Sequence, residues 1–147
     1  MAEKKYGKYF FTGSRPRPEM FGPTGSGMVG LRGIREMFLK SNLSGGGVYC
    51  DKPFVMIKGS HVHLYDDYLF FWGSNPGDID EFDAEIELYM GKGDDQEKYI
   101  INKPTIVFIP AGVIHCPLNF AKINKPVFFL HIMDHSVEPP GTPRSAH

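Results

Sequence analysis

Three histidines and one aspartate have the types and spacing of metal ligands. His61 and His63 are one residue apart, and on a β-strand residues i and i+2 share a face, so that both imidazoles can reach one ion. A strand that continues to Asp67 keeps this parity and adds an oxygen ligand. His115 follows the turn signal Pro110-Ala-Gly112, where a tight bend can aim it at the pair. Such a donor set suits Fe(II), Mn(II), Ni(II) or Zn(II), and an octahedral ion keeps two positions open for water, substrate or dioxygen.

Both segments resemble the sequence motifs of the cupins. Gly59-Ser-His61-Val-His63-Leu-Tyr-Asp-Asp67, followed by Gly73, is similar to the first motif, and Pro110-Ala-Gly112-Val-Ile-His115-Cys-Pro-Leu-Asn119 is similar to the second. The resemblance covers about residues 45 to 134. In cupins the two histidines of the first motif, its acidic residue and the histidine of the second motif bind a metal inside a β-barrel. The resemblance therefore assigns a divalent transition metal to His61, His63, Asp67 and His115.

Two positions depart from the family's pattern. The acidic ligand is usually glutamate, whereas this chain has Asp67, and the glycine that opens the second motif is matched in position by Pro104. Aspartate is shorter by one methylene and reaches less far toward an ion. The neighbouring Asp66 is no simple substitute, because strand parity places it on the opposite face.

Frequent glycines and prolines predict a chain of short strands. The 147 residues include 17 Gly and 12 Pro, and helical spacing is limited to Leu31 to Leu39. This pattern is typical of an all-β sandwich or barrel. With the resemblance, it predicts one cupin-like jelly-roll barrel (a double-stranded β-helix) over residues 28–147, with a short C-terminal tail and an N-terminal arm over residues 1–27. The expected strands are 48–58, 68–73, 84–90, 99–109 and 126–134.

Several other side chains are candidates for the site or its cavity. His131 lies in an apolar strand and either lines the cavity as an acid or base or is a core histidine. Tyr65 and Tyr68 flank Asp67 and either position a substrate or simply pack. Cys116 is expected to face away from the metal, and Asn119 to be a turn residue. The aromatic side chains expected to face the cavity are Phe70, Trp72, Phe108 and Phe129.

Composition excludes several classes of protein. A net charge of −1, without a basic cluster interleaved with aromatics, argues against nucleic-acid binding. The longest apolar run, 127–133, is too short for a membrane span, and no secretory signal is recognisable at the N-terminus. Two cysteines fit a reducing cytoplasm. The acidic loops 77–83 and 93–97 lack the spacing of a calcium loop, and we expect them to be solvated.

Two functions from different classes fit this pattern. The first is a metal-dependent enzyme acting on a small organic molecule, with dioxygenase, isomerase and lyase chemistry all open. The second is a non-catalytic module that binds or senses a small ligand, because fold alone does not decide between them. The aromatic run Tyr9-Phe10-Phe11 in the arm further predicts a homodimer, in which the arm covers the edge of a neighbouring barrel.

Overall fold

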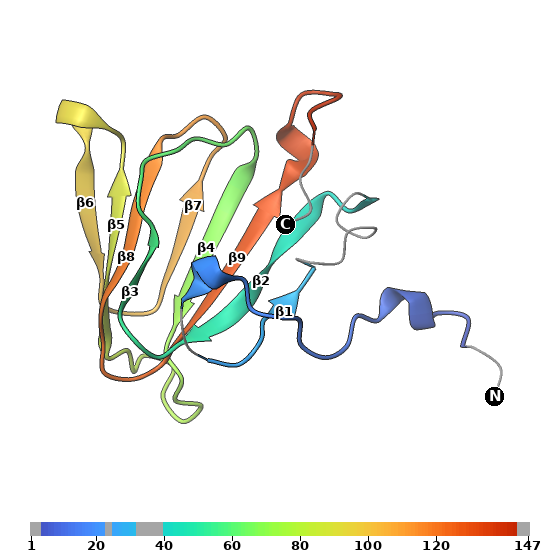
Figure 1. Ribbon diagram of the computed structural model, residues 1–147, viewed down its shortest axis with the longest axis horizontal. Coiled ribbons are helices and arrows are strands. Elements are labelled where there is room, and N and C mark those ends of the chain that lie inside the picture. Colours follow the sequence, from blue (N-terminus) through green and yellow to red (C-terminus); the bar gives the residue numbers. More distant parts are fainter. Residues whose placement is uncertain (1–3, 23–24, 32–39, 144–147) are drawn as a thin grey trace.

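The protein is built from two antiparallel β-sheets that face each other (Figure 1). The computed structural model describes residues 4–22, 25–31 and 40–143. The strands are β1 (Val29–Gly30), β2 (Leu43–Cys50), β3 (Phe54–Ile57), β4 (Asp66–Trp72), β5 (Ala84–Met90), β6 (Glu97–Ile101), β7 (Thr105–Ile109), β8 (His115–Ile123) and β9 (Val127–Asp134). Short 3-10 turns are η1 (Gly7–Tyr9), η2 (Glu19–Phe21), η3 (Gly93–Asp95) and η4 (His135–Val137). In the described ranges, no helix is long and apolar enough to cross a membrane.

The order of the strands is that of a jelly roll. One sheet has the order β1-β2-β9-β4-β7 and the other the order β3-β8-β5-β6. If β2 to β9 are counted as strands one to eight, the sheets read one-eight-three-six and two-seven-four-five. The strand pairs of a jelly roll thus alternate between the two sheets. The prediction of an all-β, cupin-like jelly roll is confirmed.

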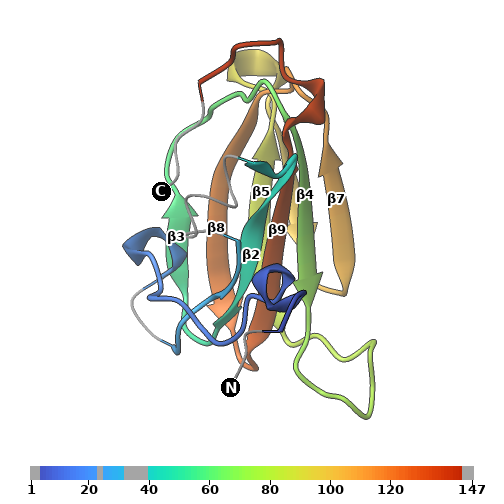
Figure 2. The ribbon, with the colours of Figure 1, turned by 90° about the vertical axis from the view of Figure 1, so that its right-hand side faces the viewer.

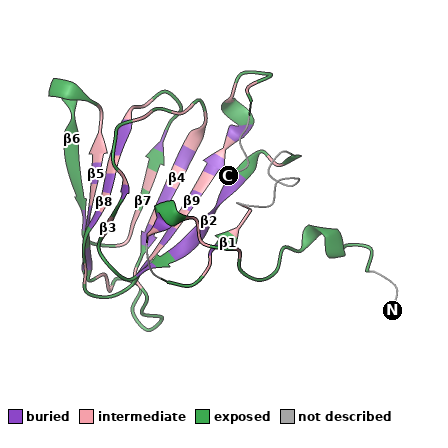
Figure 3. Ribbon diagram, in the orientation of Figure 1, coloured by how far each residue is buried: buried purple, intermediate pink, exposed green. Residues whose placement is uncertain are grey.

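The core lies between the two sheets and is rich in phenylalanine. The rings of Phe71 and Phe129 lie 5.2 Å apart, and those of Phe120 and Phe129 lie 5.8 Å apart, with all three side chains buried. In β5 the predicted alternation holds, because Ala84, Ile86 and Leu88 are buried. Figure 3 shows this alternation along the strands. Since each buried side chain of this size contributes about 1.5–3 kcal/mol, the fold has an apolar core that does not depend on an ion.

The strand predictions need three corrections. The segments 48–58 and 99–109 are each two strands, separated by turns that contain Pro53 and Pro104. The prediction missed β8, because Pro117 and the polar Asn119 interrupt its apolar pattern. Asn119 is therefore a strand residue, not a turn residue, and its amide donates to Glu87 at 3.3 Å. The expected helical stretch lies outside the described residues from position 32 to 39.

The orientation predicted for the aromatic residues is correct only for Phe129. It is buried, whereas Trp72 and Phe108 are exposed on the outer face of their sheet and Phe70 is half-buried there. Strand parity explains the error: a strand that turns Asp67 inward also turns Leu69 and Phe71 inward, and it turns Phe70 and Trp72 outward. The ring that fills the interior of β4 is therefore Phe71.

The described part of the N-terminal arm falls into two pieces. Tyr9 and Phe10 are exposed, and residues 4–14 extend away from the body (Figures 1 and 2). Phe21 and Met28, in contrast, are buried in the core, and Arg15 pairs with Met28 through two backbone hydrogen bonds of 2.8 and 3.0 Å. The described residues 15–22 and 25–28 thus belong to the packed body.

Candidate metal centre

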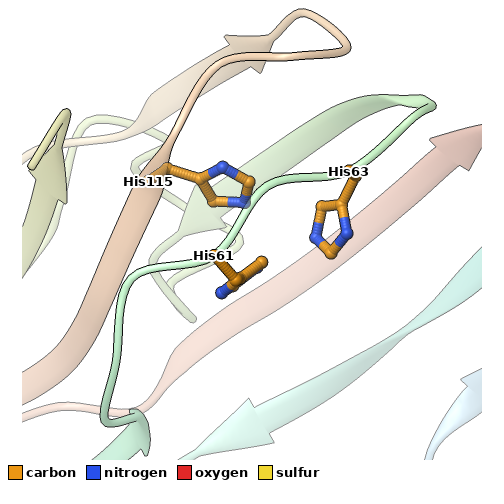
Figure 4. A group of neighbouring side chains, drawn as sticks. All are labelled: His61, His63 and His115. Atoms are coloured by element: carbon orange, nitrogen blue, oxygen red, sulfur yellow. The ribbon is translucent and has the colours of Figure 1, made fainter.

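Three of the four predicted ligands converge at one point of the interior. The metal-binding atoms of His61, His63 and His115 all lie within 4.8 Å of one another. Their ring centroids are 4.3 Å apart for His61 and His115, 4.5 Å for His61 and His63, and 5.1 Å for His63 and His115. Figure 4 shows two rings coming from the connection before β4 and the third from the start of β8. Within the described residues, no other group of three or more such ligands occurs, in the acidic loops or elsewhere.

Backbone hydrogen bonds join the two motif segments and set this geometry. The amide of His61 donates to the carbonyl of His115 at 2.9 Å, and the amide of His115 donates back at 3.0 Å. The amide of Gly112 donates to the carbonyl of His63 at 2.9 Å. The prediction that His61 and His63 lie on a regular strand is therefore wrong. They lie on an extended connection between β3 and β4, which is hydrogen-bonded to the second motif.

A tight turn aims His115 at the pair. Val113 donates its amide to the carbonyl of Pro110 at 3.2 Å, and Gly112, the third residue of this turn, has φ +86°, the left-handed value that a type II turn requires there. Asp66 fastens the turn from outside, since its Oδ1 accepts from the amide of Ala111 at 2.8 Å. Asp66 thus supports the turn, and Asp67 faces the interior.

Replacing Gly112 by alanine tests the turn. A Cβ at this position meets nothing within 4 Å, so the cost comes from the positive φ alone, about 1 kcal/mol of the free energy of unfolding. We expect metal affinity to fall about tenfold because His115 shifts. Gly13→Ala is the matched control, since Gly13 also has a positive φ of 81° and an open surrounding. Equal metal affinity in the two variants, measured by competition with a chelating dye, contradicts a role for the turn.

Two of the three histidines, His115 and His63, favour the neutral form that binds a metal. Nδ1 of His115 lies 2.9 Å from the carbonyl of Val113. Because a carbonyl only accepts, Nδ1 carries the proton and Nε2 presents its lone pair to an ion. Burial lowers the pKa of His115, and burial together with the neighbouring His61 lowers the pKa of His63 to about 4. Neither ring has to lose a proton to bind a cation at neutral pH.

The histidines form one wall of a cavity of about 330 Å³. Its walls also include Asp67, His131 and Tyr65, with apolar side chains that include Phe21, Met56 and Phe129. Its size suits a small molecule. Cys116 also lines this cavity, contrary to the prediction, because its φ of +73° breaks the alternation after His115.

Asp67 lies in the cavity wall but is not part of the histidine group. Its side chain is buried, and its Oδ1 has no hydrogen-bond partner among the described residues. Burial raises the pKa of Asp67 to about 7. A buried carboxylate oxygen of this kind is stabilised by a nearby cation, so the donor set of the cavity fits a divalent metal ion.

The other predicted residues are divided between the cavity and the surface. His131 lines the cavity, with its ring 5.4 Å from that of Phe21. Tyr65 also lines it and stacks on His63 at 4.4 Å. The structure does not bring Tyr68 to the site, since this side chain lies on the opposite face of β4, 5.0 Å from the ring of Phe108.

A buried polar network behind Tyr65 has no signal in the sequence. Nε2 of His135 lies 2.8 Å from the hydroxyl oxygen of Ser44, and its Nδ1 contacts the carboxylate of Glu138. The ring of His135 lies 4.7 Å from that of Tyr65. Although the network combines serine, histidine and glutamate, neither Ser44 nor His135 lines the cavity. The network supports the ring of Tyr65, which stacks on His63. Ser44, His135 and Glu138 form no sequence motif, because Ser44 lies far from the other two in the chain.

Comparisons with known proteins found similarity among solved structures. No family model and no curated protein sequence matches the chain. Among solved structures, a hydroxypropylphosphonic acid epoxidase from S. wedmorenis is 16% identical with a TM-score of 0.42, over 62% of this chain and 42% of that one. The SPY1581 protein from Streptococcus pyogenes is 18% identical with a TM-score of 0.42, over 69% and 68%. The DMSP lyase DddQ from Ruegeria pomeroyi DSS-3 is 18% identical with a TM-score of 0.41, over 66% and 40%.

The chain has a jelly-roll fold. It spans less than half the length of the epoxidase and of the lyase, at 42% and 40%. The assignment of ligands therefore rests on the side chains of this chain and their geometry.

Proposed function

We propose that this protein binds a divalent transition metal through His61, His63 and His115, with Asp67 as the anionic group, and acts as an enzyme on a small organic molecule. The observation that carries the proposal is the convergence of three histidine ligand atoms within 4.8 Å on the wall of a cavity of about 330 Å³. Iron, manganese, nickel and zinc all suit these donors. The ion would supply Lewis acidity and open coordination positions for oxygen atoms of the substrate.

The chain's own residues support a reaction in this cavity. Asp67 is buried in the cavity wall, and its Oδ1 has no hydrogen-bond partner among the described residues, so its carboxylate can balance part of the charge of a bound ion. His131 and Tyr65 line the same cavity and present further polar groups. Apolar side chains such as Met56 and Phe129 exclude water and suit the carbon part of a substrate. The two buried thiols, Cys50 and Cys116, fit a reducing compartment such as the cytoplasm.

Elemental analysis of protein purified without added metal tests the proposal. We expect about one equivalent of iron, manganese, nickel or zinc per chain, lost after treatment with a chelator, as a single triad of ligands dictates. Consumption of dioxygen or conversion of oxygen-bearing small molecules, lost with the metal and regained on reloading, supports an enzyme. Metal binding without any conversion supports the alternative, a ligand-binding or sensing module. Absence of bound metal, with no uptake of added metal, contradicts both.

A further inference from the structure

The two outer faces of the sandwich differ in chemistry. Antiparallel sheets usually bury one face and expose a polar one. The sheet β3-β8-β5-β6 follows this rule, since Glu87 on its outer face pairs with Lys98 at 3.2 Å and accepts from Asn119 at 3.3 Å. The other sheet breaks it. Its outward positions on β2, β9, β4 and β7 carry large apolar side chains, which are Tyr49, Phe128, Leu130, Ile132, Tyr68, Phe70, Trp72, Ile106 and Phe108.

We name these nine residues the aromatic face. Figure 2 looks onto this sheet, with β2, β9, β4 and β7 side by side. Trp72 is 39% exposed, Tyr49 and Phe108 are 50% exposed, and Ile106 is 59% exposed. The other five are half-buried. Such a surface is costly to leave in water.

Strand register makes the aromatic face continuous. Phe128 lies opposite both Tyr49 and Trp72, with ring centroids 5.0 and 6.4 Å away. Phe70 lies opposite Leu130 on one side and Ile106 on the other, in the next row. The face is also flat at β2, because Gly47 has no side chain: a Cβ there would lie 2.4 Å from the ring of Phe128.

The aromatic face has a polar boundary but no charge inside it. Next to the aromatic face, at the start of β4 and the end of β9, the outward residues are Asp66 and Asp134, which lie opposite each other. The three rows within the face contain no lysine, arginine, aspartate or glutamate. An uncharged face can meet an identical one without repulsion between like charges, which is what a two-fold interface requires.

We propose that the aromatic face is the interface of a homodimer, covered by the same face of a second copy of this chain. Aromatic side chains carry roughly 150–250 Å² each, so the nine residues expose several hundred Å², of the order of the roughly 800 Å² per partner of a standard interface. Two flat sheets pack face to face at about 10 Å, as in any β-sandwich. The arm leaves the body on the side of this sheet (Figures 1 and 2), but the proposed interface does not depend on it.

Mass in solution, measured by light scattering and by sedimentation over a range of concentrations, tests the proposal. The variants Ile106→Lys and Phe108→Lys, singly and together, place charge in the aromatic face. Both positions are at least half exposed, so the isolated chain tolerates the change. We expect a dimer for the wild type and an increase of the dissociation constant of roughly 100-fold or more in the double variant. Val55→Lys is the matched control, because Val55 is 45% exposed on the outer face of the other sheet.

A deletion variant separates the role of the aromatic face from that of the arm. Removal of residues 1–14 keeps Phe21, which is buried in the core and would be lost with a deletion of residues 1–25. We expect the shortened chain to remain a dimer. A monomeric wild type, a double variant that is as dimeric as Val55→Lys, or a dimer lost on removal of the arm alone would each overturn the proposal. The readout is independent of metal binding, so it stands apart from the proposed function.

Discussion

Alanine at His115 is expected to lower metal affinity by at least about 100-fold while the protein stays folded. His115 is the ligand that the second motif supplies, and its Nε2 is the acceptor that faces His61 and His63. Loss of one nitrogen leaves two imidazoles from a short connection and the Asp67 carboxylate, a smaller set that holds a divalent ion less tightly against water. The buried apolar core remains, so the far-ultraviolet circular dichroism and cooperative unfolding should be those of the wild type. We expect the same loss from His61→Ala and His63→Ala.

The control for the histidine variants comes from the same cavity. His131 lines it but does not belong to the group of three ligands. His131→Gln should therefore keep the metal within a few fold of the wild type, measured by the same chelator competition. Equal metal content in His115→Ala and the wild type would remove the proposed centre. A larger loss of metal affinity in His131→Gln than in the three alanine variants would indicate that the metal binds at His131 on β9.

The spatial grouping of the three histidines is the part of the site that sequence predicts best, because it depends on residue types and order. His61, His63 and His115 come together as the resemblance implies. The means by which they do so were predicted less well. Strand parity alone predicts a regular strand through His61 and His63, whereas backbone pairing to Gly112 and His115 holds them on an extended connection. These hydrogen bonds join residues about fifty positions apart, and no local pattern reveals them.

The fold shows the same division between local and distant information. The alternation in β5 is local, and the prediction of that strand from Ala84 to Met90 is confirmed. The outward direction of Trp72 and Phe108 is not local, because large aromatic side chains indicate burial whether a core or a second molecule covers them. We predicted that Trp72 and Phe108 line the cavity because both side chains are hydrophobic. Their exposure in the isolated chain is the observation that leads to the proposed interface.

Replacing Asp67 by asparagine should stabilise the metal-free protein above about pH 7 and weaken its metal binding. The pKa of Asp67 is raised to about 7 by burial, from an ordinary value of 3.8. Between these pH values the folded chain holds a proton that the unfolded chain has released, so the free energy of unfolding falls as the pH rises through this window. Asparagine has no proton to lose. The stability of the two proteins should be similar below pH 4 and should differ by up to about 4 kcal/mol above pH 7, since one pKa unit corresponds to about 1.4 kcal/mol.

The measurement is thermal or urea unfolding of the metal-free wild type and of Asp67→Asn between pH 4 and 8. Other titrating groups, including the buried His63, are the same in both proteins, so that the difference between the two curves isolates Asp67. Curves that stay parallel across the whole range would contradict a raised pKa for this carboxyl group.

Metal binding should lower the raised pKa of Asp67, because a divalent cation in the cavity favours the ionised carboxylate. Near pH 6 the wild type is expected to release about one proton more than Asp67→Asn when it binds the metal, as seen by calorimetry in buffers with different ionisation enthalpies. We expect Asp67→Ala to lose less affinity than any of the three histidine variants, since the carboxylate lies outside their group. Asp67→Glu, which restores the ligand usual in cupins, should hold the metal at least as well as the wild type. Loss of the metal from Asp67→Glu, together with its retention in Asp67→Ala, would instead define a centre of three histidines in which Asp67 serves only to move protons.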